Sequence, residues 1–349
     1  MPRVVSVATA LPSNRVSQAD TREAMAGVCR GDRAMERLLP LFDRTGVETR
    51  YFVRPLDWYA AGPSFESRNN VYAASGLELA EQAARSCLES SGVSPGAIDA
   101  IYFVTTTGLM TPSMDARLVS KLGLRSDVRR SPLFGLGCAG GAGALVRASD
   151  NLRGFPAQHA LVVSVELCSL VFSPVARTAT DLVGTALFGD GAAAVLVAGD
   201  EADGDGPTVV ATRTHLFQGA PDLMGWNFTA DGMRLVLSRE VPQFVATGVT
   251  PVVKRFLDDH DVALTDITHF VLHPGGAKVM APYRSALGLD EDDLHIARET
   301  MRRYGNQSSA SVLFMLSDLV ASGRPCQEDV GLMMALGPGF AAEMLTLSW

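Results

Sequence analysis

The chain has 349 residues, of which 47% are hydrophobic and 19% charged, and its formal net charge is −8. These values are typical of a folded globular protein and exclude a disordered chain. Lys and Arg never form a run longer than a pair, so the sequence offers no basic surface and nucleic acid is not expected as a partner.

Cysteine spacing and apolar stretches indicate the compartment. The five cysteines are scattered and lack C-x-x-C spacing, so we expect neither a disulfide framework nor a metal site, and a reducing cytoplasm fits best. The N-terminal apolar stretch is interrupted by Ser6 and Thr9, and we interpret it as a first strand rather than a secretory signal. Longer apolar stretches contain Glu166 or Gly337, so no membrane span is expected.

Apolar, β-rich runs alternate with helical patterns along the chain. The helical pattern at residues 76–89 precedes a β-rich run at 101–105, and a second helical pattern at 142–152 precedes a run at 160–165. This alternation predicts a layered α/β fold.

An acidic, glycine-rich stretch at residues 199–207 indicates a solvated turn and the best internal boundary. We therefore expect two parts, residues 1–205 and 206–349. In each part a glycine-containing turn leads into a helix of small residues, at 135–148 and at 305–316, which suggests a duplicated α/β half. Two unrelated buried helices are the alternative interpretation.

Cys138 is the first candidate for chemistry, because it lies where a turn built from Gly135 and Gly137 should become a helix. The glycines that follow cost about 1 kcal/mol each in a helix relative to alanine, so they serve close packing or ligand approach. A helix start can lower a thiol pKa from about 8.5 into the range of roughly 3.5 to 7.5. The sequence thus predicts a nucleophilic cysteine, with a small buried thiol as the alternative.

The same stretch matches G-x-G-x-x-G at Gly135, Gly137 and Gly140, and Glu166 ends the next strand. This pattern is the fingerprint of a nicotinamide-dependent oxidoreductase, in which the carboxylate binds a ribose. Residues 130–134 look like a poor buried parallel strand, which argues against that interpretation.

His273 and Asn306 complete the candidate set. His273 ends an apolar run and precedes Pro274-Gly275-Gly276, which places its imidazole at the carboxyl edge of a strand, where ligand sites form in α/β folds. Asn306 begins the second small-residue helix, where an asparagine is most often an N-cap. A helix start in a cleft can also present the amide to a substrate.

Cys138, His273 and Asn306 together suit one reaction type. The cysteine accepts an acyl group as a thioester, and the imidazole and amide donate hydrogen bonds to the carbonyl of a malonyl thioester while carbon dioxide is lost. No metal and no redox cofactor is needed for this decarboxylative condensation.

Five ordered motifs resemble the type III polyketide synthases, the chalcone synthase-like family of thiolase-fold condensing enzymes. They are GCAGGAGALVRA around Cys138, ALFGDGAAAVLV from Ala186, HPGG from His273, YGNQSSASVLF from Tyr304 and LGPGF from Leu336. Ketoacyl synthase III, an alternative within the same fold, normally has Gln-Ala-Asn after its histidine and lacks the Gly-Pro-Gly.

The resemblance implies a thiolase-like, five-layered αβαβα fold built from two similar halves, and a homodimer. It implies an acyltransferase that loads an acyl-CoA starter on Cys138, extends it with malonyl-CoA and cyclises the chain. CoA thioesters are then the substrates, and no cofactor is required.

The resemblance also implies substrate-binding residues. Phe188 resembles the family's aromatic gate near the cysteine, and Leu235 stands where a second gate phenylalanine is usual, which should widen the passage. Further cavity-lining positions are Cys168, Val171, Thr106, Thr111 and Trp226. The cations for the CoA phosphates correspond to Arg37, Arg44 and Lys278, with solvated surface charges as the alternative interpretation.

Residues 53–59, VRPLDWY, resemble bacterial alkylpyrone and alkylresorcinol synthases that use long fatty acyl starters. We expect a product of that class. The alternatives are a malonyl-primed naphthol or phloroglucinol synthase, a ketoacyl synthase III-like enzyme, and a non-catalytic protein of the same fold that only binds acyl thioesters.

Overall fold

A computed structural model describes residues 1–171, 178–230 and 232–349, except for the side chains of residues 277–279. Its centre is a nine-stranded sheet in the order β11-β12-β13-β8-β1-β7-β6-β4-β5. The strands of this sheet are β1 (Arg3–Ala10), β4 (Ile98–Thr105), β5 (Arg129–Phe134), β6 (His159–Leu167), β7 (Asp190–Ala198), β8 (Thr208–Leu216), β11 (Ile267–Leu272), β12 (Val330–Gly337) and β13 (Ala341–Ser348).

The sheet consists of two halves that are joined only at the start of β1 and β8. Strands β5, β4, β6, β7 and β1 form one half, and β8, β13, β12 and β11 form the other. The register between β1 and β8 contains the single pair Arg3 and Thr208. In each half the parallel pairs, β5-β4-β6 and β11-β12, lie to the outside, and antiparallel pairs complete the half.

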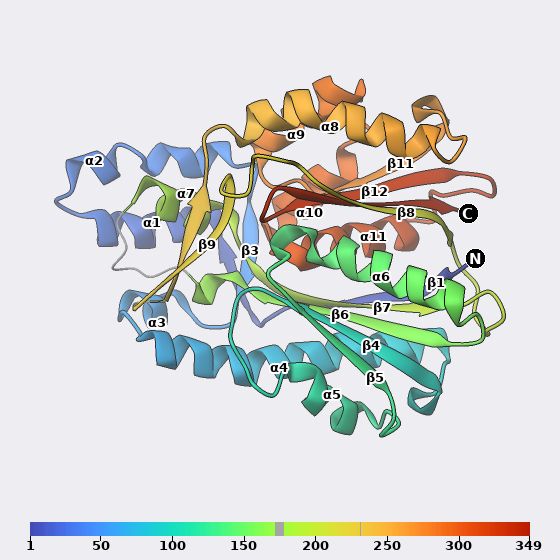
Figure 1. Ribbon diagram of the computed structural model, residues 1–349. Helices are drawn as coiled ribbons and strands as arrows, with labels where there is room; N and C mark the ends of the chain where they lie inside the picture. The colour runs from blue at the N-terminus through green and yellow to red at the C-terminus, as the bar shows by residue number, and fades with distance from the viewer. Residues whose placement is uncertain (172–177, 231) are drawn as a thin grey trace.

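Helices cover both faces of each half (Figure 1). In that view α4 and α5 lie along the bottom, α6 and α11 run between the halves, and α8 and α9 lie along the top. Their bounds are α4 (Phe65–Ser91), α5 (Met114–Leu122), α6 (Gly140–Gly154), α8 (Val241–Asp258), α9 (Ala277–Leu287) and α11 (Ser311–Ala321). Every residue of β6 and β7 is buried, as expected for strands covered on both faces.

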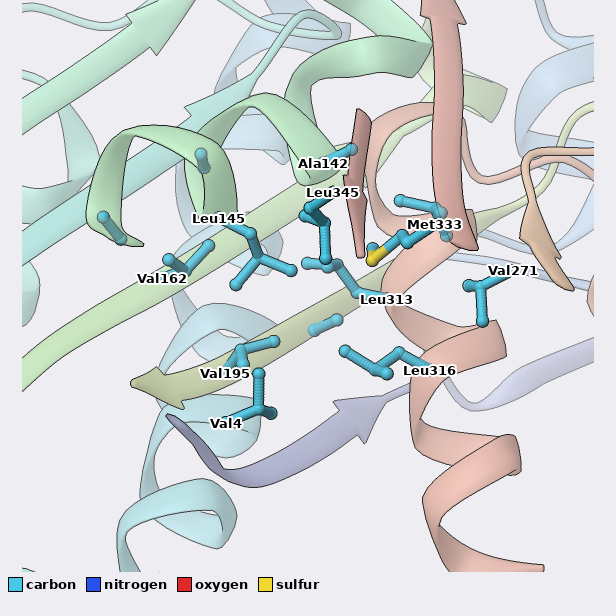
Figure 2. Close-up of a cluster of buried hydrophobic side chains, with 14 of the residues drawn as sticks. Val4, Ala142, Leu145, Val162, Val195, Val271, Leu313, Leu316, Met333 and Leu345 are labelled. Atoms are coloured by element: carbon cyan, nitrogen blue, oxygen red, sulfur yellow. The ribbon is translucent and has the colours of Figure 1, made fainter. Parts of the chain in front are cut away.

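Three hydrophobic clusters fill the spaces between these layers. The first joins α4 and α5 to one half-sheet, and the third joins α8 and α9 to the other. The second lies between the half-sheets, where Leu145 of α6 and Leu313 of α11 meet Val195 and Leu345 (Figure 2). The layers therefore follow the order helix, sheet, helix, sheet, helix, and the expected five-layered fold of two similar halves is confirmed.

Most of the remaining helices and strands gather at one end of the layers, on the left of Figure 1, whereas α10 (His295–Tyr304) lies nearer the middle. Those at this end are β2 (Asn14–Ser17), α1 (Gln18–Cys29), α2 (Arg33–Glu36), η1 (Leu39–Arg44), β3 (Thr49–Phe52), α3 (Leu56–Ala60), α7 (Ala179–Leu187), β9 (Met224–Thr229) and β10 (Gly232–Leu237). Strands β9 and β10 form a separate antiparallel hairpin. None of the described helices is both long and apolar enough to cross a membrane.

Residues 130–134 belong to a parallel strand, β5, which pairs with β4 at the edge of the sheet. The expectation that this segment makes a poor buried strand is confirmed, because no residue of β5 is buried. An edge strand tolerates Pro132 and its two preceding arginines, because one side of its backbone faces away from the sheet.

Candidate active site

Cys138, His273 and Asn306 line the same pocket. Cys138 lies in η3 (Gly137–Ala139), the turn before α6, and His273 directly follows β11. Asn306 follows α10 and precedes η6 (Ser308–Ala310), the turn before α11. The two central helices thus bring the thiol and the amide from similar turns in the two halves, and an outer strand supplies the imidazole.

Strand pairing places His273. Its backbone N–H donates to the Met334 carbonyl over 2.9 Å, which continues the parallel pairing of β11 with β12 by one residue. The chain then turns away through Gly275 and Gly276, at φ values of 57° and 149°, which glycine adopts without strain. The imidazole is 3% exposed, and neither ring nitrogen has a hydrogen-bond partner among the described residues.

Close packing in the η3 turn places Cys138. The preceding Gly137 has φ 48°, and a Cβ atom on it would lie 2.4 Å from Cδ of Pro338, so glycine is required there. The Cys138 thiol donates to Oγ of Ser308 over 3.7 Å. The cysteine is only partly exposed, because its surface opens into the pocket.

Backbone and side-chain hydrogen bonds hold Asn306. Its N–H donates to the Leu187 carbonyl over 2.8 Å, and its carbonyl accepts from Gly189 over 2.9 Å. Its Oδ1 accepts from the Ser308 N–H over 2.8 Å, and its Nδ2 donates to the Gly275 carbonyl over 3.3 Å. The amide therefore behaves as a cap at the turn and also faces the pocket, the combination expected for this position.

Burial dominates the electrostatics of the site. Burial raises the pKa of the Cys138 thiol to about 11, with Ser308 opposing the shift, and burial lowers the pKa of His273 to about 4. Both shifts favour a neutral thiol and a neutral imidazole. The expected low thiol pKa at a helix start is not met, because desolvation outweighs the effect of the helix.

The rest of the pocket wall is almost entirely apolar. Two of its side chains, Phe188 and Trp226, have ring centroids 6.4 Å apart. Predicted lining residues that do reach the pocket are Phe188, Leu235 and Trp226. Lining residues that the sequence did not single out are Leu187, Met224, Leu237, Val241, Val245, Tyr283, Ser308, Leu336 and Pro338.

Four predicted cavity residues lie elsewhere. Cys168 is fully buried beside Phe188, and Thr106 is buried with its side chain on Glu166. Thr111 is exposed. Val171 lines a small separate pocket between α4 and β10. The structure therefore does not bring these four side chains to the pocket of Cys138.

Of the three predicted CoA-binding cations, two can be placed. Arg37 at the end of α2 and Arg44 at the end of η1 are both exposed. The inner side of η1 packs against Leu182 and Ala186 of α7, the helix that ends at the pocket. Lys278 lies in α9, and its side chain is outside the described part of the structure.

The structure provides an argument against the dinucleotide fingerprint. Glu166 is fully buried and accepts hydrogen bonds from the Thr106 N–H, Thr107 Oγ1 and Ser309 Oγ, so its carboxylate is not available to a ribose. A Cβ atom on Gly140 would lie 2.5 Å from Val104, and one on Gly137 would lie 2.4 Å from Pro338, so protein atoms fill the space beside these two glycines. No cluster of three or more His, Cys, Asp or Glu suited to a metal ion occurs within residues 1–171, 178–230 and 232–349.

Comparison with known proteins identifies the family. The chain matches the N-terminal domain of chalcone and stilbene synthases over residues 2–201 and their C-terminal domain over residues 208–348. It is 37% identical to a putative chalcone synthase of Bacillus subtilis, over 100% of this chain and 99% of the relative. It is 41% identical to 1,3,6,8-tetrahydroxynaphthalene synthase of Streptomyces peucetius, over 99% of this chain and 93% of that enzyme.

Two further relatives extend the comparison. An alpha-pyrone synthesis polyketide synthase-like protein of Mycobacterium tuberculosis is 28% identical over 97% of this chain and 89% of its own length. The crystal structure of 1,3,6,8-tetrahydroxynaphthalene synthase from Streptomyces coelicolor, a bacterial type III polyketide synthase, superimposes with a TM-score of 0.95 at 29% identity, covering 99% of both chains. The chain therefore belongs to the chalcone and stilbene synthases, the type III polyketide synthase family of acyltransferases that use CoA thioesters and need no cofactor.

Proposed function

We propose that this enzyme loads an acyl group on Cys138, extends it with malonyl-CoA, and cyclises the chain to a pyrone or resorcinol-type product. The observation that carries this proposal is the meeting of one thiol, one imidazole and one primary amide in an apolar pocket. A long-chain fatty acyl-CoA is the proposed starter.

Loading begins with a proton transfer from the thiol of Cys138 to the imidazole of His273. The thiolate then attacks the carbonyl carbon of the acyl-CoA, and the C–S bond to CoA breaks. The departing CoA thiolate takes the proton back from the imidazolium. Burial favours the neutral pair before and after the transfer, so the charged pair exists only while the acyl group moves.

Extension uses the imidazole and the amide as hydrogen-bond donors. Neutral His273 donates one N–H and Asn306 donates through Nδ2 to the thioester carbonyl of malonyl-CoA. Loss of carbon dioxide leaves its electron pair as an enolate, which these donors stabilise, and each donor contributes about 10² to 10³ in rate. The enolate carbon attacks the acyl group on Cys138, and the C–S bond breaks to release the thiolate.

The pocket lining supports a fatty acyl starter. Leucine, valine and methionine side chains from β9, β10 and α8 form much of the wall. The family resemblance implies that Leu235 stands where a bulkier gate residue is usual. An aliphatic chain gains about 0.8 kcal/mol per buried CH₂ group by leaving water for such a wall, whereas a malonyl carboxylate loses its solvation.

A malonyl-primed naphthol synthase is the second candidate, and the 41% identity to a tetrahydroxynaphthalene synthase favours it. Mass spectrometry separates the two candidates. Fatty acyl-CoA with malonyl-CoA should give alkylpyrones or alkylresorcinols, and malonyl-CoA alone should give no aromatic product. A naphthol formed from malonyl-CoA alone would select the second candidate instead.

A labelling experiment tests the role of Cys138. Radiolabelled fatty acyl-CoA should label the wild-type protein and the Cys138→Ala variant should remain unlabelled and inactive. Cys326→Ala is the matched control, because this cysteine is exposed and lies outside the pocket. Equal labelling of Cys138→Ala and the wild type would disprove the covalent step.

Arg37, Arg44 and Lys278 are proposed to hold the CoA phosphates. The exposure of the two arginines at the ends of α2 and η1 supports this role, because phosphates need cations that reach solvent. Arg37→Ala and Arg44→Ala should each raise KM for both CoA substrates at unchanged kcat. Unchanged KM values in both variants would remove these residues from the site.

A homodimer through β5 is also proposed. This strand pairs only with β4 among the described strands, so its other edge is open, and its Phe134 is 50% exposed. An exposed apolar edge strand is a template for pairing with a second copy. We further propose a division of the chain at residues 205/206, which lies between the family match that ends at residue 201 and the one that begins at residue 208. We also propose a cytoplasmic location, which the scattered cysteines without C-x-x-C spacing support.

A further inference from the structure

Arg50 of β3 lies outside the pocket and is completely buried. Its Nη1 donates to the carbonyls of Thr185 and Phe188 over 2.6 and 3.1 Å, and its Nη2 donates to the carbonyl of Ala186 over 2.9 Å. These carbonyls belong to the last turn of α7 and the residue after it, where no later helical N–H is available. One guanidinium therefore caps the C-terminus of α7.

This helix end is part of the pocket. Leu187 and Phe188, which lie among the capped residues, both line it. The Leu187 carbonyl accepts from the Asn306 N–H, and the Gly189 N–H donates to the Asn306 carbonyl, so the segment pairs with Asn306 as a parallel bridge. The cap is thus connected to the amide by one short stretch of backbone.

The packing between these segments leaves no room for adjustment. A Cβ atom on Gly189 would lie 2.4 Å from the Tyr304 carbonyl oxygen and 3.2 Å from Cβ of Arg50. A Cβ atom on Gly305 would lie 2.8 Å from the Leu187 carbonyl oxygen. A shift of the helix end therefore has to move Asn306 as well.

Stability alone does not account for a buried guanidinium at this place. Burial lowers the pKa of Arg50, and the Asp190 carboxylate offsets this shift only in part. In addition, Nε of Arg50 has no hydrogen-bond partner among the described residues. Well-packed apolar side chains in place of buried charges are often neutral or stabilising. The guanidinium of Arg50 is planar and its N–H groups have fixed directions, and it donates to three carbonyls. This geometry points instead to a role in positioning.

We propose that Arg50 is a positioning residue which, through the C-terminus of α7, holds Phe188 and the Asn306 amide in the arrangement needed for decarboxylation of the malonyl thioester. This inference rests on the proposed roles of Cys138 and Asn306. Cys138 is placed by η3 and by Pro338 rather than by α7. Loss of Arg50 should consequently impair decarboxylation much more than acyl loading.

Two half-reactions measured on the same variants test the proposal. Loading is followed as radiolabelled fatty acyl group bound to Cys138, and decarboxylation as labelled carbon dioxide released from carboxyl-labelled malonyl-CoA. In Arg50→Met decarboxylation should fall by about tenfold or more, a part of the 10² to 10³ that one oxyanion donor contributes, while loading should stay within about threefold. Arg50→Lys keeps the positive charge but lacks the planar guanidinium, so it should recover only part of the decarboxylation rate that Arg50→Met loses.

Arg3→Met is the matched control. Arg3 also donates to three carbonyls, of Gly199, Ala202 and Gly204, but none of these residues lines the pocket. This variant should keep the wild-type ratio of the two half-reactions even if its stability falls.

The outcomes separate the inference from the function on which it rests. If both half-reactions fall equally in the Arg50 variants, or if neither changes, Arg50 has no positioning role. Should Arg50→Met fail to fold, the ratio in Arg50→Lys decides. Absence of carbon dioxide release by the wild-type enzyme would instead overturn the proposed function itself.

Discussion

Gly141 in α6 lies so close to Ser309 that a Cβ atom on the glycine would stand 2.1 Å from the Ser309 carbonyl oxygen. This approach explains why a helix interior contains glycines that weaken it. The close crossing of α6 over η6 also brings Cys138 within hydrogen-bonding reach of Ser308, two residues from Asn306.

The same substitution should have opposite effects at two glycines. Gly141→Ala forces a clash with backbone and should lower the free energy of unfolding by more than about 2 kcal/mol. Gly27→Ala in α1 has nothing within 4 Å of the new Cβ and should raise that free energy by about 0.5 to 1 kcal/mol. Urea denaturation measures both, and a neutral Gly141→Ala would contradict the packing argument.

His273 should make the stability of the fold depend on pH. The unfolded chain binds a proton at this residue below about pH 6.5, whereas the folded protein does so only near pH 4. The free energy of unfolding should therefore decrease as the pH falls from 6.5 to 4, by up to about 3 kcal/mol from this group. His273→Gln should lack this part of the decrease. Parallel pH profiles for the two proteins would show that the buried imidazole titrates normally.

His273 should also control the reactivity of the thiol. Burial opposes the thiolate at Cys138, and the imidazole is the base that receives its proton in the proposed loading step. In His273→Ala the alkylation of Cys138 by iodoacetamide should therefore need a higher pH than in the wild type to reach the same rate. The reaction should be followed at Cys138 by mass spectrometry, with the exposed Cys326 as an internal reference whose profile stays unchanged. Identical profiles for Cys138 would exclude the imidazole as the base.

Leu235→Phe should select shorter starters. The larger ring would enter the pocket beside Phe188 and Trp226 and reduce the space for a long chain. We expect kcat/KM for long-chain acyl-CoA to fall by about tenfold or more, because overpacking a filled site costs about 1 to 3 kcal/mol, while short starters keep their rates. Val236→Phe is the control, since the neighbouring residue in β10 points to the opposite face of the hairpin. A uniform loss for all starters would argue against a size filter.

The edge of the sheet gives a prediction about assembly. Phe134→Glu in β5 should weaken association of two copies, because a charge at the proposed interface would lose its solvation. Sedimentation velocity over a range of concentrations should show a dimer for the wild type and a shift toward monomer for the variant. An unchanged dimer would place the interface elsewhere.

The thiol, imidazole and amide that meet in the pocket could be predicted from the sequence because each stands at a change of pattern. His273 ends an apolar run before a proline and two glycines, and Cys138 and Asn306 start helices of small residues. Changes of pattern of this kind are visible in the sequence because they involve only neighbouring residues. A layered α/β fold was predictable because apolar, β-rich runs alternate with helical patterns along the chain, whereas the five layers were implied by the family resemblance.

The pocket wall could not be predicted in this way. Val241 and Val245 lie one turn apart in α8, and such a pair looks the same in sequence whether it faces a core or a cavity. The thiol pKa was missed for a related reason. A helix start is visible in sequence, but the amount of protein around a sulfur atom is not.

The hairpin of β9 and β10 belongs to neither half-sheet, yet it supplies Met224, Trp226, Leu235 and Leu237 to the wall of the pocket. The thiol, the imidazole and the amide all come from the layered core instead. Substitutions in the hairpin can therefore accumulate without displacing the thiol, the imidazole or the amide. Relatives can therefore diverge in the hairpin, and a designed change of product can be made there, while Cys138, His273 and Asn306 keep their positions.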